Sequence, residues 1–173
     1  MNNGKIKIDL YIHTKCSRDC FLSFKKNIKV CNNKGVNCVI VTDHNTIEGA
    51  LRLQKASFKV LVGEEVMTDQ REITALFLKE QILPCLSSEE TIARIKAQGG
   101  LVYVPHPITR FRKSTIKVDR LEKIWREVDV IEVFDSRNIF SKDLVAWAPF
   151  VSNLYHAFVL VFFYRKKRGY EGC

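Results

Sequence analysis

Short apolar runs that end in histidine or carboxylate side chains recur along this 173-residue chain. Residues 5–12 lead to His13, and the wholly apolar Cys38–Val41 leads to Asp43 and His44. Apolar runs of this length predict strands, and buried strands that end in polar residues are typical of parallel α/β proteins. The carboxyl ends of parallel strands meet at one rim, where such folds bind ligands. We therefore expect a site at that rim.

Predicted helices alternate with these strands along the chain. Apolar residues at helical spacing predict helices at 24–33, 46–55, 87–97 and 118–126, and Ser87 with Glu90 forms a capping box at the start of the third. Further strands are expected at 58–62, 72–78, 101–104 and 128–134. This alternation predicts an α/β fold with a mostly parallel sheet, either closed as a barrel or open.

The formal net charge of +9 favours an anionic partner, such as a phosphorylated small molecule, a nucleotide or a nucleic acid. The basic residues are scattered, however, and no basic stripe interleaved with aromatic residues indicates binding of single-stranded nucleic acid. Residues 1–9 lack the apolar core of a signal peptide, so we expect a cytoplasmic protein. The oligomeric state is not predicted by any of these features.

Residues able to bind metal ions cluster at the predicted strand ends. Three of the four histidines follow a strand, and four carboxylates lie at strand ends or starts: His13, His44, His106, Asp19, Asp43, Glu65 and Glu72. Each also fits an ordinary structural role, Asp43 for example as the cap of a helix that opens at Thr46. Together they suit zinc, manganese or iron, and two or three such ions can activate water and hold a phosphate.

Five short motifs, in order over about residues 5–140, resemble those of the PHP family, the polymerase and histidinol phosphatase superfamily. Residues 9–14 (Asp-Leu-Tyr-Ile-His-Thr) are similar to its first motif, Asp-Leu-His-x-His-Thr/Ser, and residues 17–19 to the Ser-x-Asp/His that follows. Residues 42–45, 63–65 and 105–107 resemble its second motif, its Gly-x-Glu and its His-Pro.

The resemblance implies a metal-dependent phosphoesterase, a hydrolase, on a distorted (β/α)7 TIM-like barrel that is incomplete at its C-terminus. The family holds up to three divalent ions, and we expect fewer here. Carried over motif by motif, His13 and Glu65 would bind the first metal. Glu65 would bridge to a second, which His106 also holds, and Asp19 and His44 would bind the third.

Other roles carried over from the family concern the surroundings of these ligands. Glu72 stands where the family often has a histidine at the start of the fourth strand. Asp9 and Asp43 would hydrogen-bond to ligands and orient them. Arg110 and Arg112, soon after the His-Pro motif, could bind the substrate phosphate or lie exposed to solvent.

The chain departs from the family pattern at two places. Tyr11 replaces a histidine ligand of the first motif, where it would fill the rim or bind a metal as phenolate. No Gly-Ser-Asp-Ala-His-like motif follows Phe140, so the first and third metals would each lack one ligand. An impaired phosphoesterase is one interpretation. The alternative is an inactive or fragmentary PHP module that binds metal or serves as an interaction domain.

We therefore divide the chain into a PHP domain at 1–140 and a divergent tail at 141–173. Residues 144–164 carry no charge and precede a basic run at 165–168, which fits a membrane-spanning helix. We favour instead a helix at about 141–156 and a strand at 157–164, the last unit of the barrel. A truncation or a reading-frame change after about Asp143 would also explain the lost motif.

Overall fold

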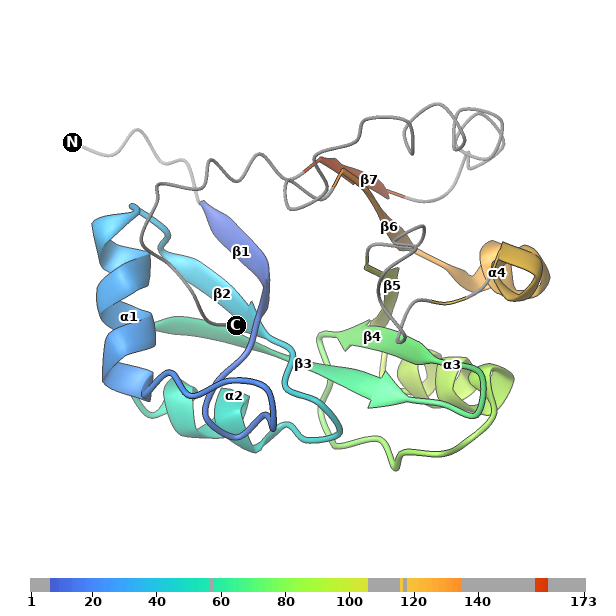
Figure 1. The fold of residues 1–173 in the computed structure, drawn as a ribbon, viewed down its shortest axis with the longest axis horizontal. Helices are drawn as coiled ribbons and strands as arrows, with labels where there is room; N and C mark the ends of the chain where they lie inside the picture. Colours follow the sequence, from blue (N-terminus) through green and yellow to red (C-terminus); the bar gives the residue numbers. More distant parts are fainter. Residues whose placement is uncertain (1–6, 57, 106–115, 117, 135–157, 162–173) are drawn as a thin grey trace.

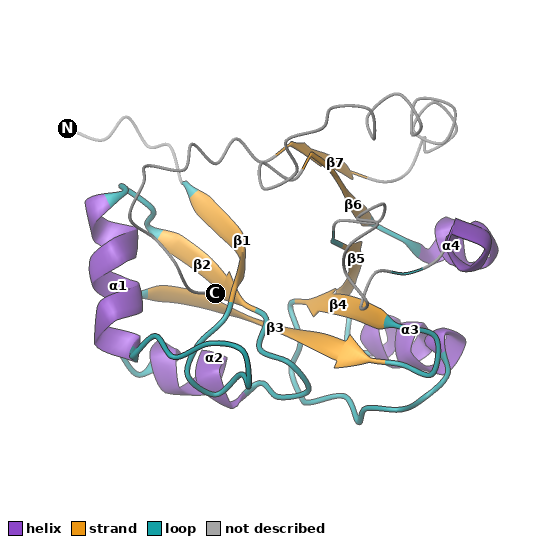
Figure 2. Cartoon of the chain, viewed as in Figure 1, coloured by secondary structure: helices purple, strands orange, loops and turns teal. Residues whose placement is uncertain are grey.

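The computed structural model describes residues 7–56, 58–105, 116, 118–134 and 158–161. Strands and helices alternate along the chain (Figures 1 and 2). In chain order they are β1 (Ile8–Ile12), α1 (Phe24–Asn33), β2 (Cys38–Val41), α2 (Glu48–Gln54), β3 (Lys59–Met67), β4 (Glu72–Leu76), α3 (Ser88–Ala97), β5 (Leu101–Val104), α4 (Val118–Ile124), the 3₁₀ turn η1 (Trp125–Glu127), β6 (Val130–Phe134) and β7 (Phe158–Val161).

The strands form one sheet in the order β1 to β7. Strand β4 is antiparallel to both of its neighbours, and every other pair is parallel. The sheet curls, with the helices on its outer side (Figure 1). The predicted α/β class is confirmed, but among the described residues no pairing joins β7 to β1. A complete (β/α)7 barrel stays a prediction.

Strand β2 shows why an unbroken apolar run forms a strand here. All four of its residues are buried. Val39 and Val41 pack with residues of α1 and α2 on the outer face of the sheet, whereas Ile40 packs with Leu76 and Tyr103 on the inner face. A strand covered on both faces has no reason to alternate in polarity, because both sets of side chains leave water.

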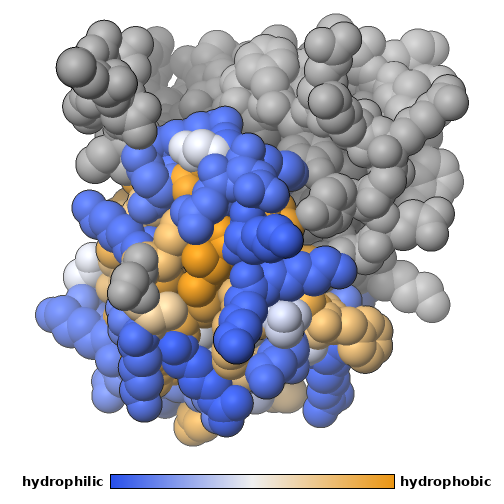
Figure 3. Space-filling model, turned by 90° about the vertical axis from the view of Figure 1, so that its left-hand side faces the viewer, coloured by the Kyte–Doolittle hydropathy of each residue, from blue (hydrophilic) through white to orange (hydrophobic). Residues whose placement is uncertain are grey.

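On the face in Figure 3, mainly hydrophilic side chains surround a small apolar area.

Strand β3 is longer than predicted. It was expected to end at residue 62, before the Gly-Glu-Glu sequence, but it continues to Met67 because β4 pairs with its second half. Gly63 permits this pairing: a Cβ there would lie 2.9 Å from the carbonyl oxygen of Ala75 and 2.9 Å from the side chain of Ile40. Contacts below 3.0 Å do not occur for real Cβ atoms, so only glycine fits.

The predicted cap of α3 is confirmed at Ser87, whose Oγ accepts a hydrogen bond of 3.1 Å from the backbone N–H of Glu90. The Glu90 carboxylate accepts from Arg94 at 2.8 Å, so the described residues show this half of the capping box alone. Strand β7 lies within the predicted final strand at 157–164 and is parallel to β6. Most of the tail lies outside the described residues, so the division near residue 140 stays a prediction. No helix in the described part of the chain is long and apolar enough to cross a membrane.

Candidate metal centre

Two strands and two loops bring the predicted ligands to one rim of the sheet. His13 and Asp19 lie in the loop after β1, His44 follows β2, Glu65 is in the second half of β3, and Glu72 is the first residue of β4. Because β4 is reversed, its start lies at the rim where the parallel strands end. An isolated parallel bridge also pairs His44 with Glu65, which sets these two ligands side by side.

Ser17 links three parts of the site, although sequence reasoning gave it no role. Its hydroxyl donates to Asp19 Oδ1 at 2.6 Å, and its oxygen accepts from the backbone N–H of His44 at 3.2 Å. Its single proton is thereby used, so His13 Nδ1, at 3.2 Å, is the donor in their hydrogen bond. That tautomer leaves the lone pair of His13 Nε2 available to a metal. The Ser-x-Asp motif, in which Ser17 lies two residues before Asp19, was the feature of the sequence that pointed to this role.

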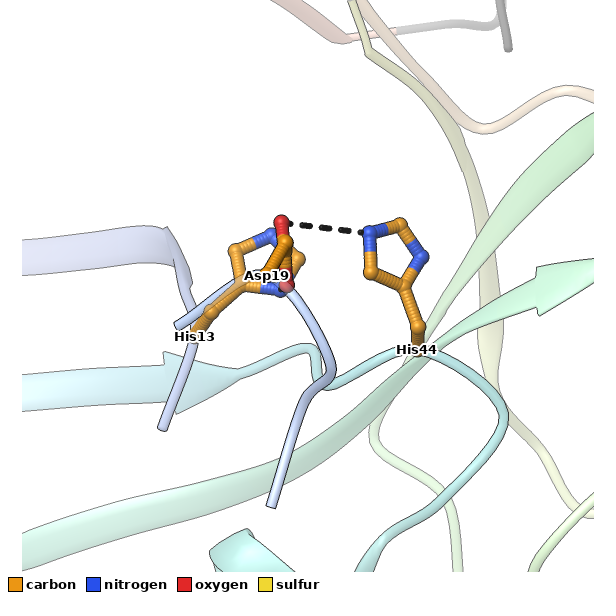
Figure 4. Close-up of side chains that lie close together, drawn as sticks. All are labelled: His13, Asp19 and His44. Atoms are coloured by element: carbon orange, nitrogen blue, oxygen red, sulfur yellow. Dashed lines mark ion pairs between the residues drawn. The ribbon is translucent and has the colours of Figure 1, made fainter. Parts of the chain in front are cut away.

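The ligand atoms form two groups of three, and His44 belongs to both. In the first, Asp19 Oδ2 lies 3.4 Å from His44 Nε2 (Figure 4), and Asp19 Oδ1 lies 3.7 Å from the protonated Nδ1 of His13, whose Nε2 is the nitrogen left for a metal. In the second, His44 Nδ1 lies 3.4 Å from Glu65 Oε2 and 3.3 Å from Glu72 Oε1. The atoms of each group lie within 4.8 Å of one another, which a single ion could span.

Burial and mutual repulsion shift the acidities of the carboxylates. Burial and the charge of Glu72 raise the pKa of Glu65 well above its ordinary value. Burial alone would raise the pKa of Asp19, but the Ser17 hydroxyl and the imidazoles of His13 and His44 outweigh it and lower that pKa. Glu65 Oε1 is buried without a hydrogen-bond partner among the described residues. A cation would relieve this crowding of negative charge, so the residues present fit a metal ion.

Asp43 fixes the loop that carries His13. Its carboxylate accepts from the backbone N–H of Thr14 at 2.5 Å and from the Thr14 hydroxyl at 2.6 Å. It does not cap a helix at Thr46: α2 has Ile47 at its N-cap position, without a side-chain hydrogen bond. Burial raises the pKa of Asp43, and the Thr14 hydrogen bonds oppose that rise. Asp43 is thereby placed to orient His13, as predicted, through the backbone of Thr14 and not by a direct hydrogen bond to the ligand.

Tyr11 also reaches into the centre. Its hydroxyl donates to Glu65 Oε2 at 2.6 Å, and its ring lies edge-on to those of His13 and Tyr103, with centroids 4.9 and 6.3 Å away. The backbone N–H of Tyr11 donates to Asp9 Oδ1 at 3.3 Å. Burial raises the pKa of Asp9. Asp9 thus contacts the backbone of Tyr11 in its own strand, and its predicted role in orienting ligands stays a prediction.

The remaining predicted site residues, His106, Arg110 and Arg112, lie outside the described residues. Their roles at the centre stay predictions. The structure therefore brings together five of the six predicted ligands, namely His13, Asp19, His44, Glu65 and Glu72.

Two proteins of Methanocaldococcus jannaschii are similar to the chain in sequence, while no protein-family model matches it. The uncharacterised protein MJ1587 is 39% identical over 145 residues, which cover 76% of this chain and 82% of that protein. The uncharacterised protein MJ0417 is 36% identical over 136 residues, which cover 76% of this chain and 54% of MJ0417. The chain thus spans about half the length of the second relative.

Solved structures with the same fold are more distant in sequence. A protein of Bifidobacterium adolescentis, assigned by inference as a metal-dependent phosphoesterase, has a TM-score of 0.71 at 13% identity over 90% of this chain and 86% of that one. A two-domain protein of Bacteroides vulgatus containing a predicted PHP-like metal-dependent phosphoesterase has 0.66 at 14% identity over 86% and 49%. An amidohydrolase of Chromobacterium violaceum with bound sulfate and no metal has 0.68 at 13% identity over 88% and 85%. These likenesses confirm the predicted PHP-like fold.

Proposed function

Since the chain belongs to the family of the M. jannaschii protein MJ1587 and shares its fold with PHP-like proteins, we propose that it is a metal-dependent phosphoesterase. The observation that carries this proposal is that His44 belongs to two groups of three potential metal ligands at one rim of the sheet. Such a concentration of buried carboxylates and imidazoles is costly unless a cation is bound among them.

Residues from both sides of the centre would hold the metal ions. Glu65 and Glu72, on the paired strands β3 and β4, would hold an ion together with His44. Asp19 and His13, held by Ser17, would complete the centre from the other side. A divalent ion in such a place lowers the pKa of water and neutralises charge on a phosphoryl group. A set rich in carboxylates suits manganese or iron, and the imidazoles also suit zinc.

The substrate we propose is a phosphorylated small molecule or a nucleotide, in the cytoplasm. The net charge of +9 supports an anionic substrate, because a positive surface attracts anions before they reach the site. Arg110 and Arg112 are proposed to bind its phosphate, and His106 is proposed to join Glu65 at a metal ion.

The proposal is tested by metal analysis and hydrolysis assays on the purified chain. We expect bound manganese, zinc or iron, and hydrolysis of p-nitrophenyl phosphate or bis-p-nitrophenyl phosphate. Glu72→Gln should lower kcat/KM by roughly a hundredfold or more, since it removes a ligand charge. Glu80→Gln, an exposed change, serves as the matched control. Protein that stays metal-free and inactive after addition of each ion would exclude this function.

A second function, metal binding without catalysis, is favoured by the hydrogen bond between Tyr11 and Glu65. That bond occupies an oxygen which the family resemblance assigns to a metal. An inactive module would bind metal ions but hydrolyse neither phosphoester. An amide substrate assayed in parallel would show whether the chain shares chemistry with the structurally similar amidohydrolase.

A further inference from the structure

The space beside Glu65 is where the family resemblance puts a first metal ion, and the described residues supply only part of a ligand set there. His13 Nε2 lies 3.5 Å from Glu65 Oε2, so these two ligands do face each other. Both groups of three ligands in the described residues contain His44, however, and neither contains His13 together with Glu65. The two ligands that the described residues supply are fewer than the three or four with which proteins usually hold a transition metal.

Tyr11 reaches the same Glu65 oxygen. Its hydroxyl donates a 2.6 Å hydrogen bond to Oε2, the atom that also faces His13. On the side of His13 this oxygen thus has a neutral donor in the place of a cation, and its second lone pair remains for an ion at His44. The resemblance to the PHP family does not extend to this residue, because a phenol donates a proton where an imidazole would offer a lone pair.

The Tyr11 ring is held firmly in this position. It packs in the cluster on the inner face of the sheet that contains Ile40, Tyr103 and Val130. Its contacts with the rings of His13 and Tyr103 are both edge-on, a preferred arrangement of aromatic groups. A side chain confined in this way keeps its hydroxyl at Glu65 instead of swinging away to admit an ion.

We propose that the hydroxyl of Tyr11 takes the place of one metal ion beside Glu65. The centre is then built around His44, and the chain binds one ion fewer than it would with histidine at position 11. This inference rests on the proposed metal centre and specifies how many ions that centre holds.

Counting the ions bound to three variants tests the inference without any assay of activity. Metal-free chain is dialysed against Mn²⁺, and bound manganese is measured per chain. Tyr11→His should bind one ion more than the wild type, because it supplies a third ligand beside His13 and Glu65. In the electron paramagnetic resonance spectrum, the added ion should couple magnetically to the one already present.

Two further variants test the hydroxyl by itself and a residue outside the centre. Tyr11→Phe should bind no added ion, and its affinity for Mn²⁺ should fall roughly tenfold, since Glu65 loses the donor that orients it. Glu80→Gln, an exposed change outside the centre, serves as the control and should change neither the count nor the affinity. Thermal melting of the metal-free variants checks that each is folded.

Either of two results would overturn the inference: an unchanged ion count in folded Tyr11→His, or unchanged Mn²⁺ affinity in Tyr11→Phe. Failure of the proposed function would look different. In that case the wild type would bind Mn²⁺, and the Tyr11 variants would alter that binding as described, but no phosphoester would be hydrolysed.

Discussion

Glu64 and Glu65 are neighbours in sequence but face opposite sides of β3, because side chains alternate along a strand. Glu65 faces the metal centre. Glu64 is fully buried with Val66 on the outer side, where its Oε2 accepts a 2.9 Å hydrogen bond from the backbone N–H of Ile82. Its Oε1 has no partner among the described residues. Burial raises the pKa of Glu64 to about 7.

The raised pKa of Glu64 predicts that metal-free protein loses stability as the pH increases. The folded state holds the proton more tightly than the unfolded state, so the contribution is complete below about pH 4.5 and disappears as the pH rises through about 7. Glu64→Gln keeps an acceptor without the charge. It should match the wild type at pH 5 and exceed it at pH 8, by on the order of 3 kcal/mol in the free energy of unfolding.

Urea denaturation at both pH values, with a chelator present, measures this effect. Glu80→Gln, at an exposed position, should follow the wild type at both. If the stabilities of Glu64→Gln and the wild type changed in parallel between pH 5 and pH 8, the buried carboxylate would not be the source.

Residues of the centre could be predicted from the sequence where they lie at the end of a predicted strand. His13, His44 and Glu65 were identified because each follows or extends an apolar run. The roles of Ser17 and Tyr11 were not, since each depends on which atom lies opposite across the fold. A sequence states that a hydroxyl is present but not which carboxylate it reaches.

Among the elements, helix α2 is positioned by a glycine in its first turn. Gly49 lies against the Asp43–Thr14 pair, so close that a Cβ would be 1.9 Å from Asp43 Oδ2 and 2.3 Å from Thr14 Oγ1. The loop that carries His13 and the start of α2 therefore share one tightly packed contact. The absence of a side chain at residue 49 is what allows it.

Gly49→Ala should therefore destabilise the protein by about 2–3 kcal/mol, since the added methyl group must separate α2 from the loop. Gly99→Ala is a suitable control: its Cβ would meet nothing within 4 Å, but its φ of +75° is unfavourable for alanine. That change should cost about 1 kcal/mol. Denaturant unfolding of both variants measures the difference. Equal losses at the two sites would contradict the close contact at Gly49.

At the level of elements, the reversal of strand β4 was not predicted. The sequence predicted the strand and its first residue, Glu72, and the mostly parallel sheet is confirmed, but it did not show that this one strand runs the other way. Direction depends on the connection between β3 and β4, which is too short for a crossover and so forms an antiparallel pair. This reversal brings the start of β4 to the rim, and Glu72 with it.

At the scale of the whole molecule, the centre joins segments that are distant in sequence. Asp19, His44 and Glu72 come from three separate parts of the chain, and in the metal-free protein their neighbourhood is crowded with carboxylates. An ion that binds only the folded state stabilises that state by mass action. Metal binding and global stability should therefore be coupled.

Saturating Mn²⁺ should accordingly raise the melting temperature. At one hundred times the dissociation constant the gain is about 2.7 kcal/mol, which corresponds to roughly 5–10 °C for a chain of this size. Differential scanning calorimetry with Mn²⁺ and with a chelator measures the shift. Glu72→Gln should lose most of it, whereas Glu80→Gln should keep it. The same shift in both variants would place the ion elsewhere.

The α/β class and the rim site followed from the alternation of apolar runs and helical patterns, which is a property of the whole chain. Closure of the sheet did not, because it depends on contacts between the first and last strands. Nothing in the periodicity of either strand specifies such a contact.

Gly63 has a consequence for folding errors. If β3 slipped by one residue against its neighbours, each of its side chains would move to the other face of the sheet. A slip in one direction would put Glu64 in the place of Glu65, so the adjacent glutamates alone do not reject this wrong alignment. Gly63 does, because the same slip would bring Val62 to a position where a Cβ would lie 2.9 Å from the carbonyl oxygen of Ala75. Gly63, which is not a ligand itself, thus prevents a misaligned β3 from forming a site that resembles the native one.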